Sequence, residues 1–335
     1  MSVSAETEAL KDVASAFMKS QVLLVANQYD LFTKIDGRNM TSEEMAGLLG
    51  TDHRATRMIL DVLVGMNYLE KRNGRYRNAE VSRRLLVAGS PYYQGDSLRH
   101  RYRLWFSWSA LRDVLKTGKP PEDISVEYPV SEEERTKNYI LAMANMSRIK
   151  AEQLAGTIDL SGVKVLLDLG GGPGTYALAF ARRYPELRAV VYDLPEVCPI
   201  AEEQIAQAEL SDRVTTKPGD FLTDKLGNGY DAIFISSIIH IYSLIENQHI
   251  LNKCFQALPQ GSRIVVKDFF LNEDRSGPLP SLLFAINMLV RTKAGDVYTF
   301  RQVEEMLTEA GFTGLRRVEF AEQSWVIQGH KERSG

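Results

Sequence analysis

A glycine-rich loop between a short apolar run and a helix-forming segment is the feature that most constrains the fold of this chain. The loop is Gly170-Gly-Gly172-Pro-Gly174, and it follows the apolar run Val165-Leu-Leu-Asp168-Leu. Glycines at such a place let a ligand approach main-chain amides at the positive end of a helix. The pattern therefore predicts an α/β domain that binds a cofactor at this loop.

The spacing of the glycines separates two classes of cofactor. In the dinucleotide fingerprint Gly-x-Gly-x-x-Gly, the third glycine would fall on Thr175, whereas this chain places glycines at 170, 172 and 174. Asp168 precedes the first of them, where a carboxylate would repel a pyrophosphate. A cofactor with a cationic amino-acid end would be attracted instead. S-adenosyl-L-methionine has such an end, together with a sulfonium.

Acidic residues also follow the next two predicted strands. Asp193 ends the strand at 189–192, where a carboxylate can accept both ribose hydroxyls of NAD or of S-adenosyl-L-methionine. Asp220-Phe221 follow the strand at 213–217. There an acid suits the exocyclic amine of an adenine, and an aromatic ring can pack on its face. Together, in order and at strand ends, these residues predict a nucleoside-containing cofactor.

Strands and helices alternate from residue 163 onward. This order predicts a parallel sheet with right-handed crossovers, and a closely spaced last pair of strands predicts an antiparallel edge. The predicted strands lie at 164–169, 189–192, 213–217, 231–239, 263–269, 314–320 and 325–330. The predicted helices lie near 174–184, 197–208, 243–258, 282–292 and 299–310.

The first hundred residues predict a winged helix. An apolar helix over 17–35 is followed by a capped helix that opens at Thr41-Ser-Glu-Glu44 and by another over 52–66. Asn73-Gly74 then joins two half-apolar strands, which is typical of a hairpin. We place a dimerisation domain at 1–115 and the cofactor-binding domain at 116–335, with bridging helices over 116–160.

The predicted winged helix has two readings, DNA binding or dimerisation. The helix at 52–66 carries only Arg54 and Arg57 as cations, together with Asp61, and the net charge of the chain is −3. Nucleic-acid affinity needs clustered Lys and Arg. The apolar helix at 17–35 would be costly to expose and needs a partner chain. We therefore expect a homodimer formed through this domain, and no nucleic-acid partner.

Composition excludes several further classes of protein. Hydrophobic residues make up 44% and charged residues 25% of the chain, as in a folded globular protein. No apolar run approaches the roughly 18 residues that cross a bilayer, and no signal peptide is evident. Cys198 and Cys254 are expected to be buried, and the five scattered His favour no metal site. We expect a cytoplasmic protein with no membrane partner.

The chain resembles the S-adenosylmethionine-dependent O-methyltransferases of the caffeate and acetylserotonin type over nearly its whole length. The segment Asp168–Gly174 and the later Tyr192-Asp-Leu-Pro-Glu-Val197 carry this resemblance. It implies a Rossmann-like methyltransferase domain and an intertwined dimer through the winged-helix domain. The cofactor-binding residues it implies are Ser147, Asp168, Gly170, Gly172, Gly174, Asp193, Leu194, Asp220, Phe221 and Ser236. Ser236 stands where many members place a Lys.

The resemblance also implies which residues perform the chemistry. His240 follows the predicted strand at 231–239 and would be a general base, since a neutral imidazole can take a phenol proton near neutral pH. Asp268 matches a family acid that would orient the imidazole. A second family acid falls on Val297 and is missing. This departure suits an acceptor that needs little deprotonation.

Three functions remain open from the sequence. The first is methylation of a hydroxyl of a small aromatic molecule, with His240 as base. The second is S- or C-methylation by proximity without an essential base, and the third is a cofactor-sensing transcription factor. The expected acceptor pocket consists of Trp105, Trp108, Tyr139, Met143, Tyr242, Phe284, Met288 and Thr292.

Overall fold

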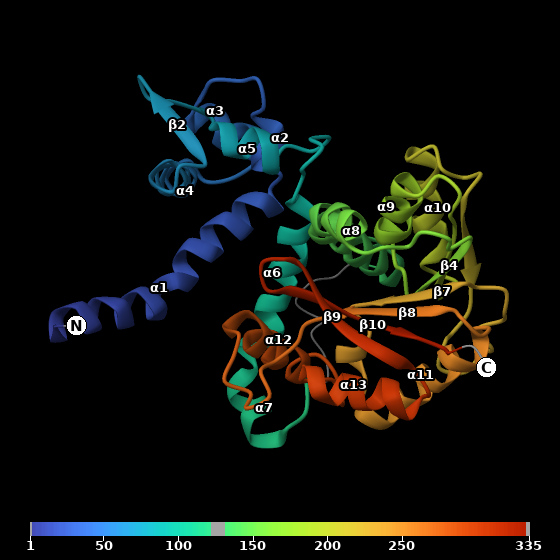
Figure 1. Ribbon diagram of the computed structural model, residues 1–335. Coiled ribbons are helices and arrows are strands. Elements are labelled where there is room, and N and C mark those ends of the chain that lie inside the picture. The colour runs from blue at the N-terminus through green and yellow to red at the C-terminus, as the bar shows by residue number, and fades with distance from the viewer. Residues whose placement is uncertain (1, 122–130, 333–335) are drawn as a thin grey trace. The chain divides into compact units, whose positions relative to one another are not determined.

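The computed structural model describes residues 2–121 and 131–332 and separates the chain into two compact units (Figure 1). Unit 1 comprises Met1–Trp105 and unit 2 comprises Phe106–Gly335. The predicted domain boundary after residue 115 stays a prediction. The two compact units meet after Trp105, but this division does not show which residues take part in dimerisation.

Unit 1 contains helices and a small three-stranded sheet with strand order β1-β3-β2. Its elements are α1 (Val3–Gln28), α2 (Leu31–Lys34), β1 (Met40–Thr41), α3 (Ser42–Leu49), α4 (His53–Gly65), β2 (Leu69–Arg72), β3 (Arg75–Asn78) and α5 (Glu80–Leu85). The helix α6 (Gly95–Ser109) continues into unit 2. The predicted order of helix, helix and hairpin is confirmed.

Local sequence explains where these elements begin and turn. Thr41 forms the predicted capping box, since its hydroxyl accepts from the amide of Glu44 and its own amide donates to the Glu44 carboxylate at 2.8 Å. Asp52 caps α4 by accepting from the amide of Ala55 at 2.8 Å. The apolar faces then meet in one core, which includes Phe32, Ile35, Met45, Leu60, Leu63 and Tyr76.

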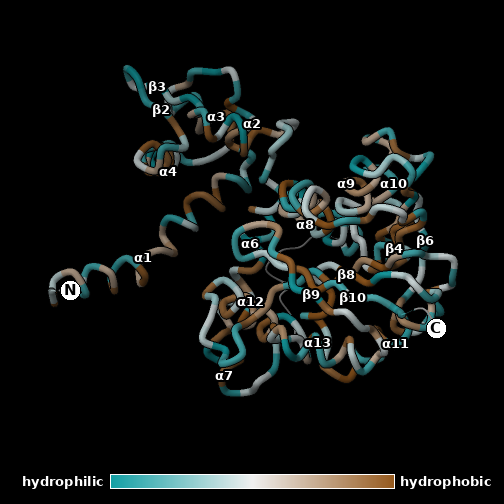
Figure 2. Tube along the Cα trace, viewed as in Figure 1, coloured by the Kyte–Doolittle hydropathy of each residue, from teal (hydrophilic) through white to brown (hydrophobic). Residues whose placement is uncertain are grey.

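The predicted single helix over 17–35 is wrong in two respects. The helix α1 begins much earlier, at Val3, and ends at Gln28, and α2 follows as a separate turn. The break comes at Asp30, whose φ of 53° is left-handed and cannot continue an α-helix. Along α1, Leu10, Val13 and Phe17 stay exposed, and Figure 2 shows hydrophobic stretches on this helix.

Unit 2 is an α/β domain built on a seven-stranded sheet. Its strands are β4 (Val165–Leu169), β5 (Arg188–Asp193), β6 (Val214–Pro218), β7 (Ala232–Ser236), β8 (Arg263–Asp268), β9 (Thr313–Ala321) and β10 (Ser324–His330). Its helices are α7 (Leu111–Thr117), α8 (Glu132–Thr157), α9 (Thr175–Arg183), α10 (Cys198–Gln207), α11 (Leu244–Ala257), α12 (Leu279–Leu289) and α13 (Phe300–Glu309), with the short 3-10 helix η2 (Ile239–Ile241). No helix among the described residues is long and apolar enough to span a membrane.

The strand order is β6-β5-β4-β7-β8-β10-β9. The first five strands in this order run parallel, and β10 pairs antiparallel with both β8 and β9, which confirms the predicted antiparallel edge. From β4 the chain continues to β5 and β6 on one side of β4 in the sheet. It then returns to β7 on the other side of β4, so the direction of the strand order reverses at β4. Ligands of such sheets bind at the carboxyl ends of the strands beside this switch point.

Two hydrophobic clusters cover the two faces of the sheet. Successive residues of β4 and β7 alternate between them, because strand side chains point to opposite faces. One cluster includes residues of α8, α9 and α10, and the other includes residues of α11 and α13. Figure 1 shows α9 and α10 on one side of the sheet and α11 and α13 on the other. Cys198 and Cys254 are both buried thiols, as predicted.

Candidate active site

The glycine loop joins β4 to α9 in a conformation that favours glycine. Gly170, Gly172 and Gly174 have φ values of 64°, 55° and 73°. A Cβ on Gly170 would clash with Ile238, and one on Gly171 would lie 2.7 Å from Cγ of Asp168. At Gly172 the nearest atom would be Cδ1 of Ile140, 4.0 Å away. Protein atoms therefore fill the space beside Gly170 and Gly171, whereas the space beside Gly172 is free of close protein atoms.

Asp193 holds this loop against the end of β5. The amide of Gly172 donates to one carboxylate oxygen at 2.7 Å, and the amide of Leu194 donates to the other at 2.8 Å. Burial raises the pKa of Asp193, and these two hydrogen bonds partly offset that effect. Each oxygen keeps a lone pair for a ligand hydroxyl. The residue predicted to hold a ribose therefore lies beside the loop.

Asp168 is a buried carboxylate on β4. It is only 1% exposed, and neither carboxylate oxygen makes a hydrogen bond to a described residue. Burial raises its pKa to about 7, while the nearby amide of Ala177 acts in the opposite direction without reaching hydrogen-bond geometry. A buried carboxylate without a partner is costly. A cationic ammonium group placed at the loop would supply the missing partner, so these residues fit the amino-acid end of S-adenosyl-L-methionine.

Asp220 and Phe221 follow β6, as predicted. The Asp220 carboxylate accepts a hydrogen bond from the amide of Leu222 at 2.8 Å, and this bond stabilises the turn that begins at Asp220. A Cβ on Gly170 would lie 3.4 Å from the Phe221 ring, so this ring lies beside the glycine loop. Phe221 also meets Tyr242 edge to face at 5.9 Å between ring centroids. Tyr242, predicted for the acceptor pocket, thus contacts a residue predicted for the adenine.

The strand before His240 is shorter than the predicted strand at 231–239. It ends at Ser236, because Ser237 adopts a left-handed φ of 59°. The amide of Ser237 donates to the carbonyl of Lys267, and the Lys267 ammonium donates to the Ser237 hydroxyl at 3.0 Å. His240 therefore lies on η2 rather than at the end of the strand. The turn brings it toward β8.

His240 and Asp268 form a buried pair. His240 is 6% and Asp268 7% exposed, and Nδ1 of His240 lies 2.6 Å from the Asp268 carboxylate. The carboxylate also accepts from the amide of Phe269 at 2.8 Å. Burial alone would raise the pKa of Asp268, but His240, Lys267 and these hydrogen bonds hold it below its usual value. Asp268 is therefore an ionised acceptor that orients the imidazole.

The other imidazole nitrogen is available to a ligand. Nε2 of His240 makes no hydrogen bond within the described part of unit 2. The ring of Phe284 meets the imidazole edge to face at 4.7 Å between centroids, and Phe269 stacks on Phe284 at 4.0 Å. Phe269 was missed by the sequence reasoning, although it directly follows Asp268. Two aromatic rings thus pack near an imidazole whose Nε2 makes no hydrogen bond to a described residue of unit 2.

Within residues 2–121 and 131–332, no other acid takes the place of the missing second acid. Val297 is completely buried. Its neighbour Asp296 pairs instead with Arg275 at 3.0 Å and accepts from the amide of Val297. The next residue, Tyr298, donates its hydroxyl to the carbonyl of Tyr242 at 2.6 Å. Among the described residues, Asp268 is thus the one carboxylate hydrogen-bonded to the His240 ring.

The predicted acceptor pocket is brought together in part. On α12, Phe284 contacts His240 and Met288 is buried one turn further on. The indole of Trp108 donates to the amide oxygen of Asn287 at 3.1 Å, a partner that the sequence reasoning missed. The side chain of Asn287 could have been noticed as the one amide in a helix whose other residues, apart from Ser281, are apolar.

Two predicted pocket residues have other contacts. Thr292 uses its hydroxyl within the fold, since it donates to the carbonyl of Met288 and accepts from the amide of Gly295. Trp105 belongs to unit 1, where its ring lies 6.3 Å from that of Phe17. The roles of both residues, and those of Met143, Ser147 and Ser236, stay predictions.

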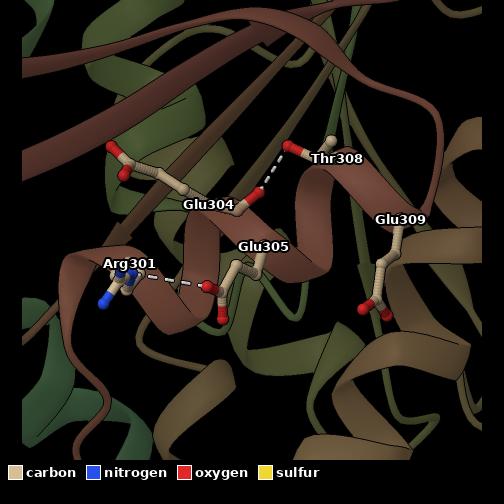
Figure 3. A pocket seen from close by; sticks show the side chains of 5 residues that line it. All are labelled: Arg301, Glu304, Glu305, Thr308 and Glu309. Atoms are coloured by element: carbon tan, nitrogen blue, oxygen red, sulfur yellow. Dashed lines mark hydrogen bonds and ion pairs between the residues drawn. The ribbon is translucent and has the colours of Figure 1, made fainter.

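A surface hollow on α13 is not the active site (Figure 3). All five side chains that line it come from this one helix: Arg301, Glu304, Glu305, Thr308 and Glu309. Arg301 pairs with Glu305 at 3.5 Å, and Glu304 pairs with Arg317 of β9 at 2.6 Å. The hollow therefore exposes a solvated face with mostly satisfied charges. Among the described residues, no cluster of three His, Cys, Asp or Glu could hold a metal ion.

Comparisons with known proteins show what this chain is similar to. The solved structure of human N-acetylserotonin methyltransferase in complex with SAM superposes with a TM-score of 0.89 at 26% identity, covering 99% of this chain and 100% of that chain. The sheet, the glycine loop and this likeness define an S-adenosyl-L-methionine-dependent methyltransferase with a Rossmann-like domain.

Sequence comparison narrows the class to a family. An O-methyltransferase domain matches residues 108–313, and an O-methyltransferase dimerisation domain matches residues 11–88. The chain belongs to the O-methyltransferase family. A relative from Streptomyces sahachiroi, 3-hydroxy-5-methyl-1-naphthoate 3-O-methyltransferase, is 34% identical over 93% of this chain and 91% of its own length. Acetylserotonin O-methyltransferase from Bos taurus is 30% identical over 92% of each.

Proposed function

We propose that this enzyme transfers a methyl group from S-adenosyl-L-methionine to a hydroxyl of a small aromatic molecule, with His240 as general base. The observation that carries the proposal is the buried His240–Asp268 pair, whose imidazole has the rings of Phe284 and Phe269 packed near it. The relatives named for a hydroxynaphthoate and for acetylserotonin act on hydroxylated aromatic molecules, which supports the same acceptor class.

The residues of the glycine loop would hold the cofactor, which supplies an electrophilic methyl group on a sulfonium. Asp168 would pair with its ammonium group, and the open side of Gly172 would face it. Asp193 would accept its ribose hydroxyls, while Asp220 and Phe221 would bind the adenine. Leu194 is exposed beside Asp193 and would cover the ribose.

His240 would remove the acceptor proton. The ionised Asp268 accepts a hydrogen bond from Nδ1–H, and this assignment leaves a lone pair on Nε2. Nε2 would take the hydroxyl proton, while the bound cofactor would supply the methyl group and leave as S-adenosylhomocysteine after its methyl–sulfur bond breaks. Asp268 stabilises the imidazolium that forms. The aromatic rings of Phe269 and Phe284 exclude water and align the acceptor.

S- or C-methylation by proximity is the second candidate, and two observations favour it. Val297 removes the second acid near the base. The L-tyrosine C(3)-methyltransferase from Streptomyces lavendulae is also 30% identical over 94% of this chain. In this case His240 would orient the acceptor without removing a proton. A cofactor-sensing role has no such support, and cytoplasmic placement stays a prediction.

The position of the transferred methyl group separates these functions. The enzyme would be incubated with methyl-labelled S-adenosyl-L-methionine and a panel of phenols, catechols, thiols, thioethers and activated aromatic carbons. Mass spectrometry would then locate the new methyl group. We expect it on a phenolic oxygen. Label on sulfur or carbon alone would contradict the hydroxyl proposal while leaving the cofactor site intact.

Replacing Asp268 with asparagine should lower kcat about 10- to 100-fold, because the amide can favour the wrong imidazole tautomer. The affinity for S-adenosyl-L-methionine should stay unchanged, since Asp268 lies on β8 and the glycine loop lies after β4. Steady-state kinetics and calorimetric titration of the cofactor check the two parts. An unchanged kcat would show that Asp268 does not support a base.

We also propose that α1 forms part of a homodimer interface. Leu10, Val13 and Phe17 recur at helical spacing on one side of α1 and are about 50–80% exposed, which is unfavourable in a free monomer. The double substitution Val13→Glu with Phe17→Glu should convert the dimer to a monomer in light scattering. Lys11→Glu adds an acid elsewhere on the same helix and should leave the dimer intact. A dimer that survives the double substitution would place the interface elsewhere.

A further inference from the structure

Asn247 is a buried amide on α11 that the proposed mechanism does not use. It is 1% exposed and lies in the first turn of the helix, where its main-chain amide donates to the carbonyl of Ser243 at 2.9 Å. Its side-chain nitrogen donates to the carbonyl of Ile239 at 2.8 Å and to that of Tyr242 at 3.1 Å. One side chain therefore spans the turn that carries His240.

The two acceptors fix the orientation of the Asn247 amide. Nδ2 carries two hydrogen atoms, one for each carbonyl, whereas Oδ1 in the same place would repel both carbonyl oxygens. Oδ1 itself has no hydrogen-bond partner among the described residues. An unpaired buried oxygen costs free energy, which offsets part of what the two hydrogen bonds contribute to stability. The main consequence of these bonds is thus the position of the turn.

Other contacts hold the same turn. The hydroxyl of Tyr298 donates to the Tyr242 carbonyl at 2.6 Å, and a Cβ on Gly295 would clash with the His240 carbonyl. The carbonyls of the turn thus meet α11 and the segment between α12 and α13. The amide and the ring of His240 instead meet the Asp268 carboxylate, at 3.4 Å and 2.6 Å. The ring keeps its aim at Asp268 only while this main chain keeps its place.

We propose that Asn247 is a positioning residue that fixes the main chain of η2 and thereby aligns the His240 imidazole with Asp268 and with the acceptor. This inference rests on the proposed role of His240 as general base. Misplacing a reacting group by about 1 Å can lower a rate about 100-fold. Asn247 acts through the turn and not on the reacting atoms, so its loss should lower kcat and leave binding largely intact.

The main variant is Asn247→Leu, which keeps the approximate size of the side chain and removes its donors. The fold should tolerate it, because the Tyr242 carbonyl keeps the Tyr298 hydroxyl and the Ile239 carbonyl keeps the Tyr242 amide at 3.4 Å. We expect kcat to fall about 10- to 100-fold, with KM and the affinity for S-adenosylhomocysteine changed less than about threefold. The acceptor is 1-naphthol or catechol, whichever the wild type methylates faster.

A ¹⁵N spectrum of the histidine rings reports the alignment of His240 without any acceptor. The chain contains five His, so selective labelling gives few signals, and His240→Asn identifies the signal of His240. With S-adenosylhomocysteine bound at pH 8, the wild type should show one tautomer with the proton on Nδ1, because Asp268 accepts from it. Asn247→Leu should show a mixture of both tautomers. If neither acceptor is methylated, this spectrum decides alone.

Gln248→Ala is the matched control, because Gln248 follows Asn247 on α11 and its amide also donates to a main-chain carbonyl, that of Met306 at 3.1 Å. It should keep the wild-type kcat and the single tautomer. An unchanged tautomer in Asn247→Leu, or equal effects in both variants, would overturn the proposal. A changed tautomer with unchanged kcat would support the positioning role and contradict His240 as the base. Should the leucine variant not fold, Asn247→Ala is measured in the same way.

Discussion

Replacing His240 with alanine is expected to lower kcat at least a hundredfold, while the affinity for S-adenosyl-L-methionine changes less than about twofold. A general base contributes roughly 10²–10⁴-fold to a reaction that removes a proton. His240 is the buried imidazole whose Nε2 has no partner in the described part of unit 2, and Asp268 holds its other nitrogen at 2.6 Å. The cofactor residues lie on other strand ends, so binding should persist.

The alanine variant also leaves Asp268 buried without its partner, which lowers stability. His240→Asn is therefore the second variant, because its amide can still donate to Asp268 but cannot accept a proton. Both variants should lose at least a hundredfold in kcat, and the asparagine variant should keep a thermal midpoint closer to that of the wild type. His249→Ala removes an exposed imidazole on α11 and serves as the control with normal turnover. Near-normal turnover in His240→Asn would support transfer by proximity.

Much of the fold could be predicted because its signals are local. The glycine loop, the strand-end acids and the capping residues each specify the backbone within a few residues of themselves. Thr41 and Asp52 cap the helices that they were predicted to cap. Two errors in element bounds occurred where one residue adopts a left-handed backbone without being glycine, whereas the early start of α1 at Val3 has a different origin. Asp30 divides the first helix and Ser237 shortens β7. The presence of an Asp or a Ser in a sequence does not by itself predict a left-handed backbone at that position.

The site was less predictable because its contacts join distant segments. The residues His240 and Asp268 were singled out by resemblance, but nothing local predicts that the turn after Ser237 brings them within 2.6 Å. The stacking of Phe269 on Phe284 and the bond between Trp108 and Asn287 depend on how α12 packs, which periodicity does not encode.

Asp168→Asn is expected to weaken cofactor binding and to stabilise the cofactor-free protein at the same time. The carboxylate is buried without a hydrogen-bond partner, and its pKa is raised to about 7. Compared with the ordinary value of 3.8, this corresponds to a destabilisation of roughly 4 kcal/mol once the group is ionised in both states. An amide of the same shape removes the buried charge. It also removes the partner of the cofactor ammonium group, so affinity should fall about 10- to 100-fold.

The pH dependence gives this prediction a definite sign. Because the folded-state pKa of Asp168 is raised, its neutral form favours the folded protein most at a pH below the unfolded value of 3.8. The stabilising contribution of the neutral form decreases as the pH rises from 3.8 toward about 7. Above about 7 the carboxylate is ionised in both states, and its destabilisation of the folded protein no longer changes with pH. Denaturant unfolding of the cofactor-free proteins should therefore show the asparagine variant more stable than the wild type at pH 8, with the difference shrinking toward pH 5. Calorimetric titration at pH 8 measures the loss of cofactor affinity. A variant that loses stability at pH 8 would show that Asp168 already has a partner inside the folded chain, and its carboxylate would then have no need of a ligand ammonium group.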